Sequence, residues 1–141
     1  MKYVLDSSAA LPWVLPEKDS AKAIQLRGEA RNAVHELLAP DIFPVEVAHA
    51  LTRAERRARV IVGQARHLLL DVLTTPPQFH PYRMLLTRAV DISSPMRIGV
   101  YDCLYVALAE QEKCELVTAD DKLIKNLQAA FPFIVPLASM P

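Results

Sequence analysis

The chain has 141 residues with 16 basic and 16 acidic side chains, so its formal net charge is zero. A chain of this length is typical of one domain with a sizeable core, and we expect a single domain over residues 1–141. The hydrophobic content of 52% and the charged content of 23% exclude a disordered chain. A balanced charge gives no overall attraction to nucleic acid, so any such binding must depend on a local patch.

The sequence gives no sign of a membrane span or of a secretory signal. No apolar run approaches the ~20 residues that a transmembrane helix needs. Asp6 interrupts the first apolar run, and Pro12 and Pro16 interrupt the next. We therefore expect a cytoplasmic protein. The two cysteines, Cys103 and Cys114, are too few for a disulfide framework and lack zinc-ligand spacing, so we expect free thiols.

Short apolar runs alternate with helical patterns along the whole chain. Strands are expected at residues 2–6, 37–39, 78–80, 115–119 and 133–135. Helices are expected at residues 7–14, 19–34, 41–59, 64–73, 82–90, 100–109 and 121–130. Strands that alternate with helices imply βαβ units, so the expected fold class is α/β with a mostly parallel sheet.

The helix expected at 41–59 has a marked apolar stripe. Asp41 is its expected N-cap, and Pro44 lies in its first turn. The stripe extends to Ala58, and Glu46 lies on its flank. A carboxylate on this flank can face a cleft at the edge of the core.

Other carboxylates occupy corresponding places at the ends of expected strands. Asp6 closes the first strand and Asp120 follows the fourth, with Asp121 as its neighbour and alternative. The carboxyl ends of parallel strands meet at one edge, which is where open α/β sheets bind ligands. Asp102 lies in the first turn of a helix that is apolar nearly all round, where the helix dipole favours an anion.

Each of these acids alone fits a structural role, as a helix cap or as a solvated residue. Gathered together, they would repel one another and raise each other's pKa values unless a cation neutralised them. Ligand sets made only of oxygen suit Mg²⁺ or Mn²⁺. Such an ion activates water and stabilises a phosphodiester during in-line displacement. The chain has neither a glycine-rich phosphate loop nor a G-x-S-x-G elbow.

Four segments of the sequence resemble the motifs of PIN-domain nucleases. They are residues 4–8, 44–47, 101–109 and 116–120, and the last two together are the more specific. The resemblance covers the whole chain. Its length and order are similar to those of the VapC ribonuclease toxins of VapBC toxin–antitoxin pairs.

The resemblance implies a three-layer α/β/α fold with a mostly parallel five-strand sheet. It also implies a metal-dependent endoribonuclease that hydrolyses RNA phosphodiesters. The acidic cluster that would hold Mg²⁺ or Mn²⁺ consists of Asp6, Glu46, Asp102 and Asp120. We expect Asp6 and Asp102 to bind the ion directly, and the other two to orient water or a second ion. The accessory hydroxyls are those of Ser8 and Thr118.

The implied partners are an RNA substrate, an antitoxin whose tail enters the acidic groove, and a second copy in a homodimer. Arg53 and Arg57 share the helix flank of Glu46 and are the expected RNA contacts. The alternative for these arginines is a solvated helix end.

Two other functions stay open from the sequence. One is a catalytically silent PIN-like module that binds RNA or protein. The other is a Mg²⁺-dependent phosphoacceptor signalling domain, which needs an aspartate on a central strand and a nearby lysine. Lys122 is the only lysine near the acidic positions, and no mid-chain strand ends in aspartate.

Overall fold

The computed structural model describes residues 1–141. Five strands form one sheet in the order β3-β2-β1-β4-β5, and every neighbouring pair is parallel. The strands are β1 (Lys2–Leu5), β2 (Glu36–Pro40), β3 (Gln78–His80), β4 (Glu115–Thr118) and β5 (Ile134–Pro136). Strands covered by helices on both faces read as continuous apolar runs, which is why the sequence predicts them. The expectation of a five-strand, mostly parallel sheet is confirmed.

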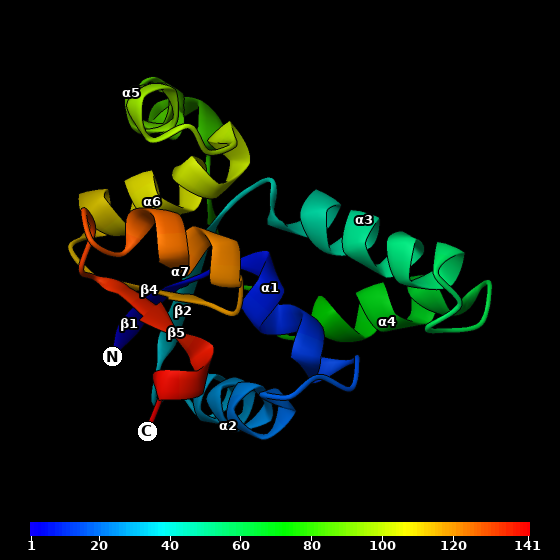
Figure 1. Cartoon of the computed structure of the whole chain (residues 1–141). Helices are drawn as coiled ribbons and strands as arrows, with labels where there is room; N and C mark the ends of the chain where they lie inside the picture. Colours follow the sequence, from blue (N-terminus) through cyan, green and yellow to red (C-terminus); the bar gives the residue numbers. More distant parts are fainter.

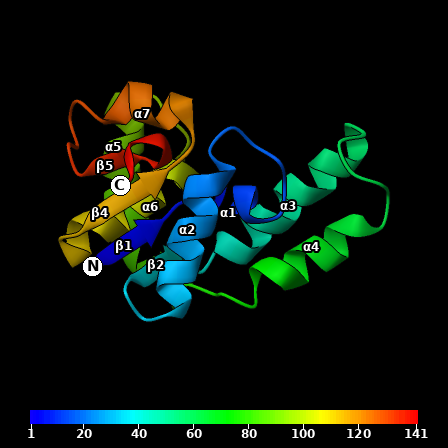
Figure 2. The same cartoon turned by 90° about the horizontal axis from the view of Figure 1, so that it is seen from below.

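Helices cover both faces of this sheet. They are α1 (Ser7–Ala10), α2 (Ser20–Arg31), α3 (Phe43–Arg56), α4 (Gln64–Val72), α5 (Leu86–Met96), α6 (Val100–Glu112) and α7 (Asp121–Leu127). Short 3₁₀ turns are η1 (Leu11–Trp13), η2 (Tyr82–Leu85) and η3 (Leu137–Ser139). Helices α6 and α7 lie over one face, with α5 outside α6, and α2 lies over the other (Figures 1 and 2). This is the expected three-layer α/β/α arrangement. None of these helices is long and apolar enough to cross a membrane.

Helices α3 and α4 form an arm that extends away from the sheet. They lie side by side in both views (Figures 1 and 2). The stripe of α3 that the sequence predicts is buried at Phe43, Val47, Leu51 and Ala54. Because α1 packs against the start of α3, the first turns of the arm lie beside the carboxyl end of β1.

Two details of α3 differ from the expectation. Asp41 is not the N-cap, which is Ile42; the Asp41 Oδ1 accepts a hydrogen bond from the Tyr82 N–H at 2.9 Å. This carboxylate binds the segment that follows β3, because β2 and β3 end side by side. The helix stops at Arg56 instead of Arg59, since Ala58 adopts a left-handed φ of 58° and is exposed.

Other helices also differ in length from the prediction: α1 ends at Ala10 instead of near residue 14, and α7 ends at Leu127 instead of near residue 130. Helix α2 ends at Arg31, not Val34, because Ala33 has a φ of 59° and the chain turns back there. Helix α5 continues to Met96, past the predicted end at Val90, because residues such as Ile92 remain buried there. The first residues of the helix predicted at 82–90 form the separate 3₁₀ segment η2 instead.

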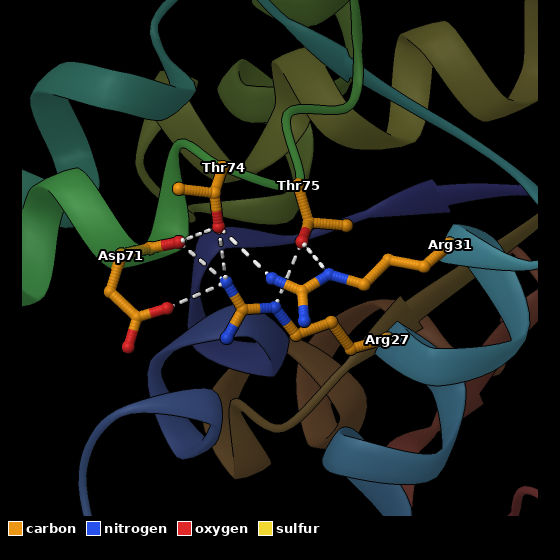
Figure 3. Close-up of polar contacts among 5 residues, drawn as sticks. All are labelled: Arg27, Arg31, Asp71, Thr74 and Thr75. Carbon is orange, nitrogen blue, oxygen red and sulfur yellow. Dashed lines mark hydrogen bonds and ion pairs between the residues drawn. The ribbon is translucent and has the colours of Figure 1, made fainter.

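A buried arginine ties α2 to the segment between α4 and β3 (Figure 3). Arg27 is only 8% exposed and lies over the ring of Trp13, 4.8 Å from its centroid. Its guanidinium donates to the Asp71 Oδ1 at 2.9 Å and to the Thr75 Oγ1 at 3.0 Å. Arg31, one turn later, also donates to Thr75, at 2.8 Å. The cluster anchors the far end of α4 against the body of the protein.

Candidate active site

The carboxyl edge of the sheet brings the first and last predicted acids together. Strands β1 and β4 are neighbours with Leu5 opposite Val117. The Asp6 N–H continues this ladder by donating to the Val117 carbonyl at 3.0 Å. Asp6 and Asp120 therefore leave the sheet at the same edge, each immediately before a helix.

A pocket of about 560 Å³ opens at this edge. It is lined by Asp6, Ser7, Ser8, Leu11, Val45, Glu46, His49, Ala50, Arg53, Tyr101, Asp102 and Asp120. All four predicted acids are among these residues. Asp121 is exposed and outside the lining, so Asp120 is the member of this pair that faces the pocket.

Asp6 lies at the base of the pocket and is 3% exposed. Its Oδ2 accepts hydrogen bonds from the Ser8 Oγ at 2.5 Å and the Thr118 Oγ1 at 2.8 Å. Burial raises the pKa of Asp6, and these two hydroxyl donors act in the opposite direction. Ser8 lines the pocket, whereas Thr118 is fully buried beneath it. Both hydroxyls hold one oxygen of Asp6 in place.

Glu46 enters the pocket from the first turn of α3. Its Oε1 accepts a hydrogen bond from the Tyr105 hydroxyl at 2.7 Å and a longer one from the Ser7 Oγ at 3.5 Å. Burial is the main reason that the pKa of Glu46 is raised; the Tyr105 hydrogen bond lowers it, and the nearby Asp6 raises it further. The side chain is thus held by groups from both α6 and α1.

Asp102 is the acid whose ionisation the pocket perturbs most clearly. Burial raises the pKa of Asp102 to about 7, and the charges of Asp6, Asp120 and Glu46 act in the same direction. Only Lys122 opposes them. Burial and the neighbouring negative charges therefore both oppose ionisation of this carboxyl group.

Asp120 has two roles that the sequence left as alternatives. Its Oδ1 accepts from the N–H groups of Lys122 at 2.9 Å and Leu123 at 3.3 Å, so it caps α7. Its own N–H donates to the Thr118 Oγ1 at 3.1 Å. The residue caps α7 and also lines the pocket.

The four acids line a common wall without closing on one point. No three His, Cys, Asp or Glu side chains are close enough together to surround a single ion. An open set of carboxylates nevertheless fits Mg²⁺, which retains several waters and takes one or two carboxylates directly. The oxygen-only donors and the raised pKa of Asp102 both fit a hydrated divalent cation.

The two predicted RNA-binding arginines lie in different places. Arg53 is in the lining of the acidic pocket. Arg57 lies outside it and lines an adjoining hollow of about 200 Å³, which it shares with Arg53 and Arg59. The two hollows share Leu11 as well as Arg53, so they adjoin along this wall.

Sequence reasoning missed three residues of this site. His49 lies three residues after Glu46, and Tyr101 lies next to Asp102; both line the pocket. The spacing of His49 from Glu46 was the signal available, because residues three apart share a helix face. Tyr105 was hidden in an apolar run, although a buried tyrosine hydroxyl usually needs a partner.

The family of the chain follows from comparison with known proteins. The sequence matches the PIN domain over residues 3–128. The chain belongs to the PIN domain family. The match includes all four acids, from Asp6 to Asp120, and both strands that end beside the pocket.

Relatives of this PIN domain include VapC ribonucleases. Ribonuclease VapC3 of Pyrobaculum aerophilum is 30% identical over 131 residues, which are 92% of this chain and 97% of that protein. Ribonuclease VapC9 of Mycobacterium tuberculosis is 33% identical over 134 residues, which are 94% of this chain and 96% of that protein.

Two solved structures share the fold of this PIN domain. PAE2754 from Pyrobaculum aerophilum has a TM-score of 0.69 at 22% identity, covering 99% of this chain and 94% of that one. VapBC2 from Rickettsia felis, bound to a DNA fragment from its promoter, has a TM-score of 0.63 at 16% identity. That match covers 96% of this chain and 97% of the other.

Proposed function

We propose that this PIN domain is a metal-dependent endoribonuclease and the toxin of a type II toxin–antitoxin pair. The relatives named as VapC ribonucleases support the class of reaction. The observation that carries the proposal is the convergence on one pocket of four carboxylates, which come from the ends of two strands, the start of α6 and the arm. The substrate class is RNA, and the reaction is hydrolysis of its phosphodiesters.

In this proposal the acids divide the work of holding Mg²⁺ or Mn²⁺. Asp6 and Asp102 would bind the ion directly, while Glu46 and Asp120 would orient its waters or a second ion. When bound, the ion supplies an activated water and stabilises negative charge on the phosphodiester. A cation in the pocket would also lower the pKa of Asp102 from the value that it has in the metal-free pocket.

The hydroxyls beneath Asp6 prepare it for this task. Ser8 and Thr118 both donate to the Oδ2, which leaves the Oδ1 free of these two bonds. A carboxylate fixed by two donors loses little freedom when it binds a ligand, so the pocket is organised before substrate arrives.

Arg53 and Arg57 are the groups we assign to the RNA backbone. Phosphates would otherwise be repelled by the acidic pocket, and guanidinium groups bind phosphate oxygens in pairs. Neither arginine forms an ion pair with an acidic side chain in this structure. The hollow that they line adjoins the acidic pocket, so a bound RNA chain would run along α3.

The partners follow from the same assignment. A relative of this fold is known in a complex named VapBC2, so we propose a cognate antitoxin that covers the acidic pocket. We also propose a homodimer and a cytoplasmic location, in keeping with an enzyme that meets cellular RNA.

Two alternatives predict different behaviour. A silent binding module would bind RNA without cleaving it, although all four acids are in place here. A phosphoacceptor domain would need an aspartate at the end of a central strand, a place that Asp6 does occupy, but the relatives of this chain are named as ribonucleases. Labelling with a phosphodonor is therefore expected to leave the protein unmodified.

The direct test is cleavage of labelled RNA by the wild type and by Asp6→Asn. We expect cleavage with Mg²⁺ or Mn²⁺, none with a chelator, and a loss of roughly a hundredfold or more in the variant. Asp121→Asn is the matched control, because Asp121 is exposed and outside the pocket. Full activity of Asp6→Asn, or turnover that survives the chelator, would overturn the proposal.

A further inference from the structure

Tyr105 is the largest fully buried side chain of the protein, and its hydroxyl ends beside the acidic pocket. The ring lies in α6, three residues after Asp102, so both side chains leave the same face of that helix. The hydroxyl donates to the Glu46 Oε1 at 2.7 Å. It is the only hydrogen bond that joins α6 to α3.

Glu46 needs such a partner for two reasons. It is the only one of the four acids on the arm, whereas the other three follow strands or begin α6. A glutamate side chain also has more rotatable bonds than an aspartate, and the negative charge of the nearby Asp6 repels its carboxylate. Its other donor, the Ser7 Oγ, is 3.5 Å away, at the limit of a hydrogen bond.

We propose that Tyr105 is a positioning residue, which holds the Glu46 carboxylate in the pocket and thereby sets the affinity of the site for its divalent cation. The inference rests on the proposed function, because it concerns the cation that this function requires. The tyrosine does not touch RNA or the ion; it acts through Glu46. A hydrogen bond from a neutral donor to a charged acceptor shifts such an equilibrium by roughly ten- to a hundredfold.

The test compares two conservative variants. Tyr105→Phe removes the hydroxyl and keeps the buried ring, so the fold is expected to persist. Tyr3→Phe is the matched control, because Tyr3 is also buried (5% exposed), on β1, but does not line the pocket. Mn²⁺ binding to each purified protein is measured by calorimetry, and RNA cleavage is measured over a range of Mg²⁺ concentrations.

We expect Tyr105→Phe to bind Mn²⁺ roughly tenfold more weakly than the wild type. Its kcat should fall at low Mg²⁺ and recover partly at high Mg²⁺, while KM for RNA changes less than about twofold, because no RNA contact is lost. Tyr3→Phe should match the wild type in all three quantities. A Tyr105→Phe protein with wild-type Mn²⁺ affinity and kcat would overturn the inference.

A double-mutant comparison tests whether Tyr105 acts through Glu46. In the Glu46→Gln background, Tyr105→Phe should cause little further loss of Mn²⁺ affinity, since the charged acceptor is already gone. An undiminished loss in that background would contradict the assigned role. Wild-type protein that neither binds Mn²⁺ nor cleaves RNA would overturn the proposed function itself, whereas a normal wild type beside an unaffected Tyr105→Phe would overturn this inference alone.

Discussion

Asp102 shows how a single residue reports on the whole pocket. Its carboxyl group is half-buried and faces three other acids, and its pKa is raised to about 7 from an ordinary value of 3.8. Between these two pH values the folded protein keeps a proton that the unfolded chain has released. The contribution of Asp102 to the stability of the metal-free protein therefore falls as the pH rises from about 4 to about 7.

The direction of this pH dependence gives a prediction for Asp102→Asn. In chelator, the melting temperature of the wild type should be lower at about pH 8 than at about pH 5. The variant should show a shallower fall and melt roughly 3 °C higher than the wild type at the upper pH, because one repelled charge is gone. Mg²⁺ should raise the wild-type melting temperature more at the upper pH, since it binds the ionised form. A variant whose melting temperature changes with pH in chelator in the same way as that of the wild type would contradict this account.

At the scale of residues, the sequence predicted some roles and concealed others. Asp6 and Asp120 were predictable because each follows an apolar run that becomes a parallel strand. Tyr105 was concealed because tyrosine in a buried helix reads as core, and its acceptor comes from a residue 59 positions away. Asp41 reads as a cap by its position, but the segment that follows the neighbouring strand β3 supplies a competing donor, the Tyr82 N–H.

Helix α3 is the element that joins the acidic pocket to a basic surface. Arg53 lines the pocket, and Arg57 follows immediately after the helix end, in the adjoining hollow. Each phosphate contact with single-stranded nucleic acid adds roughly 0.7 to the slope of log affinity against log salt. The element therefore makes a quantitative prediction.

Replacing both Arg53 and Arg57 with alanine should weaken RNA binding roughly tenfold at low salt and reduce the salt slope by roughly 1.4. The measurement is RNA affinity at several salt concentrations, in the Asp6→Asn background to prevent cleavage. A double replacement of Arg56 and Arg66 is the control, since both are exposed on the same arm and line neither hollow. Equal effects of the two double variants on RNA affinity and on the salt slope would contradict the role assigned to Arg53 and Arg57.

Helix α2 carries the other element-scale prediction. Arg27 is buried and lies over the ring of Trp13. It donates to Asp71 and Thr75 (Figure 3). Arg27→Ala should lower the free energy of unfolding by about 3 kcal/mol, because the ion pair, the stacking and the buried hydrogen bonds are lost together.

The control for Arg27 is Arg31→Ala, one turn along the same helix. Arg31 also bonds to Thr75 but is exposed, so its loss should cost less than about 1 kcal/mol. Urea unfolding measures both. Equal losses for the two variants would show that burial of Arg27 is unimportant to its contribution. The sequence did not predict this cluster, since its members come from separate segments that carry no shared pattern.

For the whole molecule, the direction of the sheet explains why distant acids meet. All five strands are parallel, so their carboxyl ends share an edge, and β1 lies beside β4 although more than 100 residues separate them. The alternation of apolar runs and helices predicted a mostly parallel sheet, and the resemblance to PIN-domain nucleases implied the three-layer arrangement. The boundaries of α2, α3 and α5 were less predictable, because single residues such as Ala33 and Ala58 adopt left-handed conformations that alanine rarely favours.

The central claim is that this edge of the sheet holds a divalent cation for RNA cleavage. The most direct measurement is an anomalous difference map from crystals of the protein soaked in Mn²⁺. The account predicts a peak in the pocket within coordination distance of carboxylate oxygens from Asp6 and Asp102, and its loss in Asp6→Asn. A soaked crystal with no peak in this pocket, or with Mn²⁺ bound only elsewhere, would contradict it.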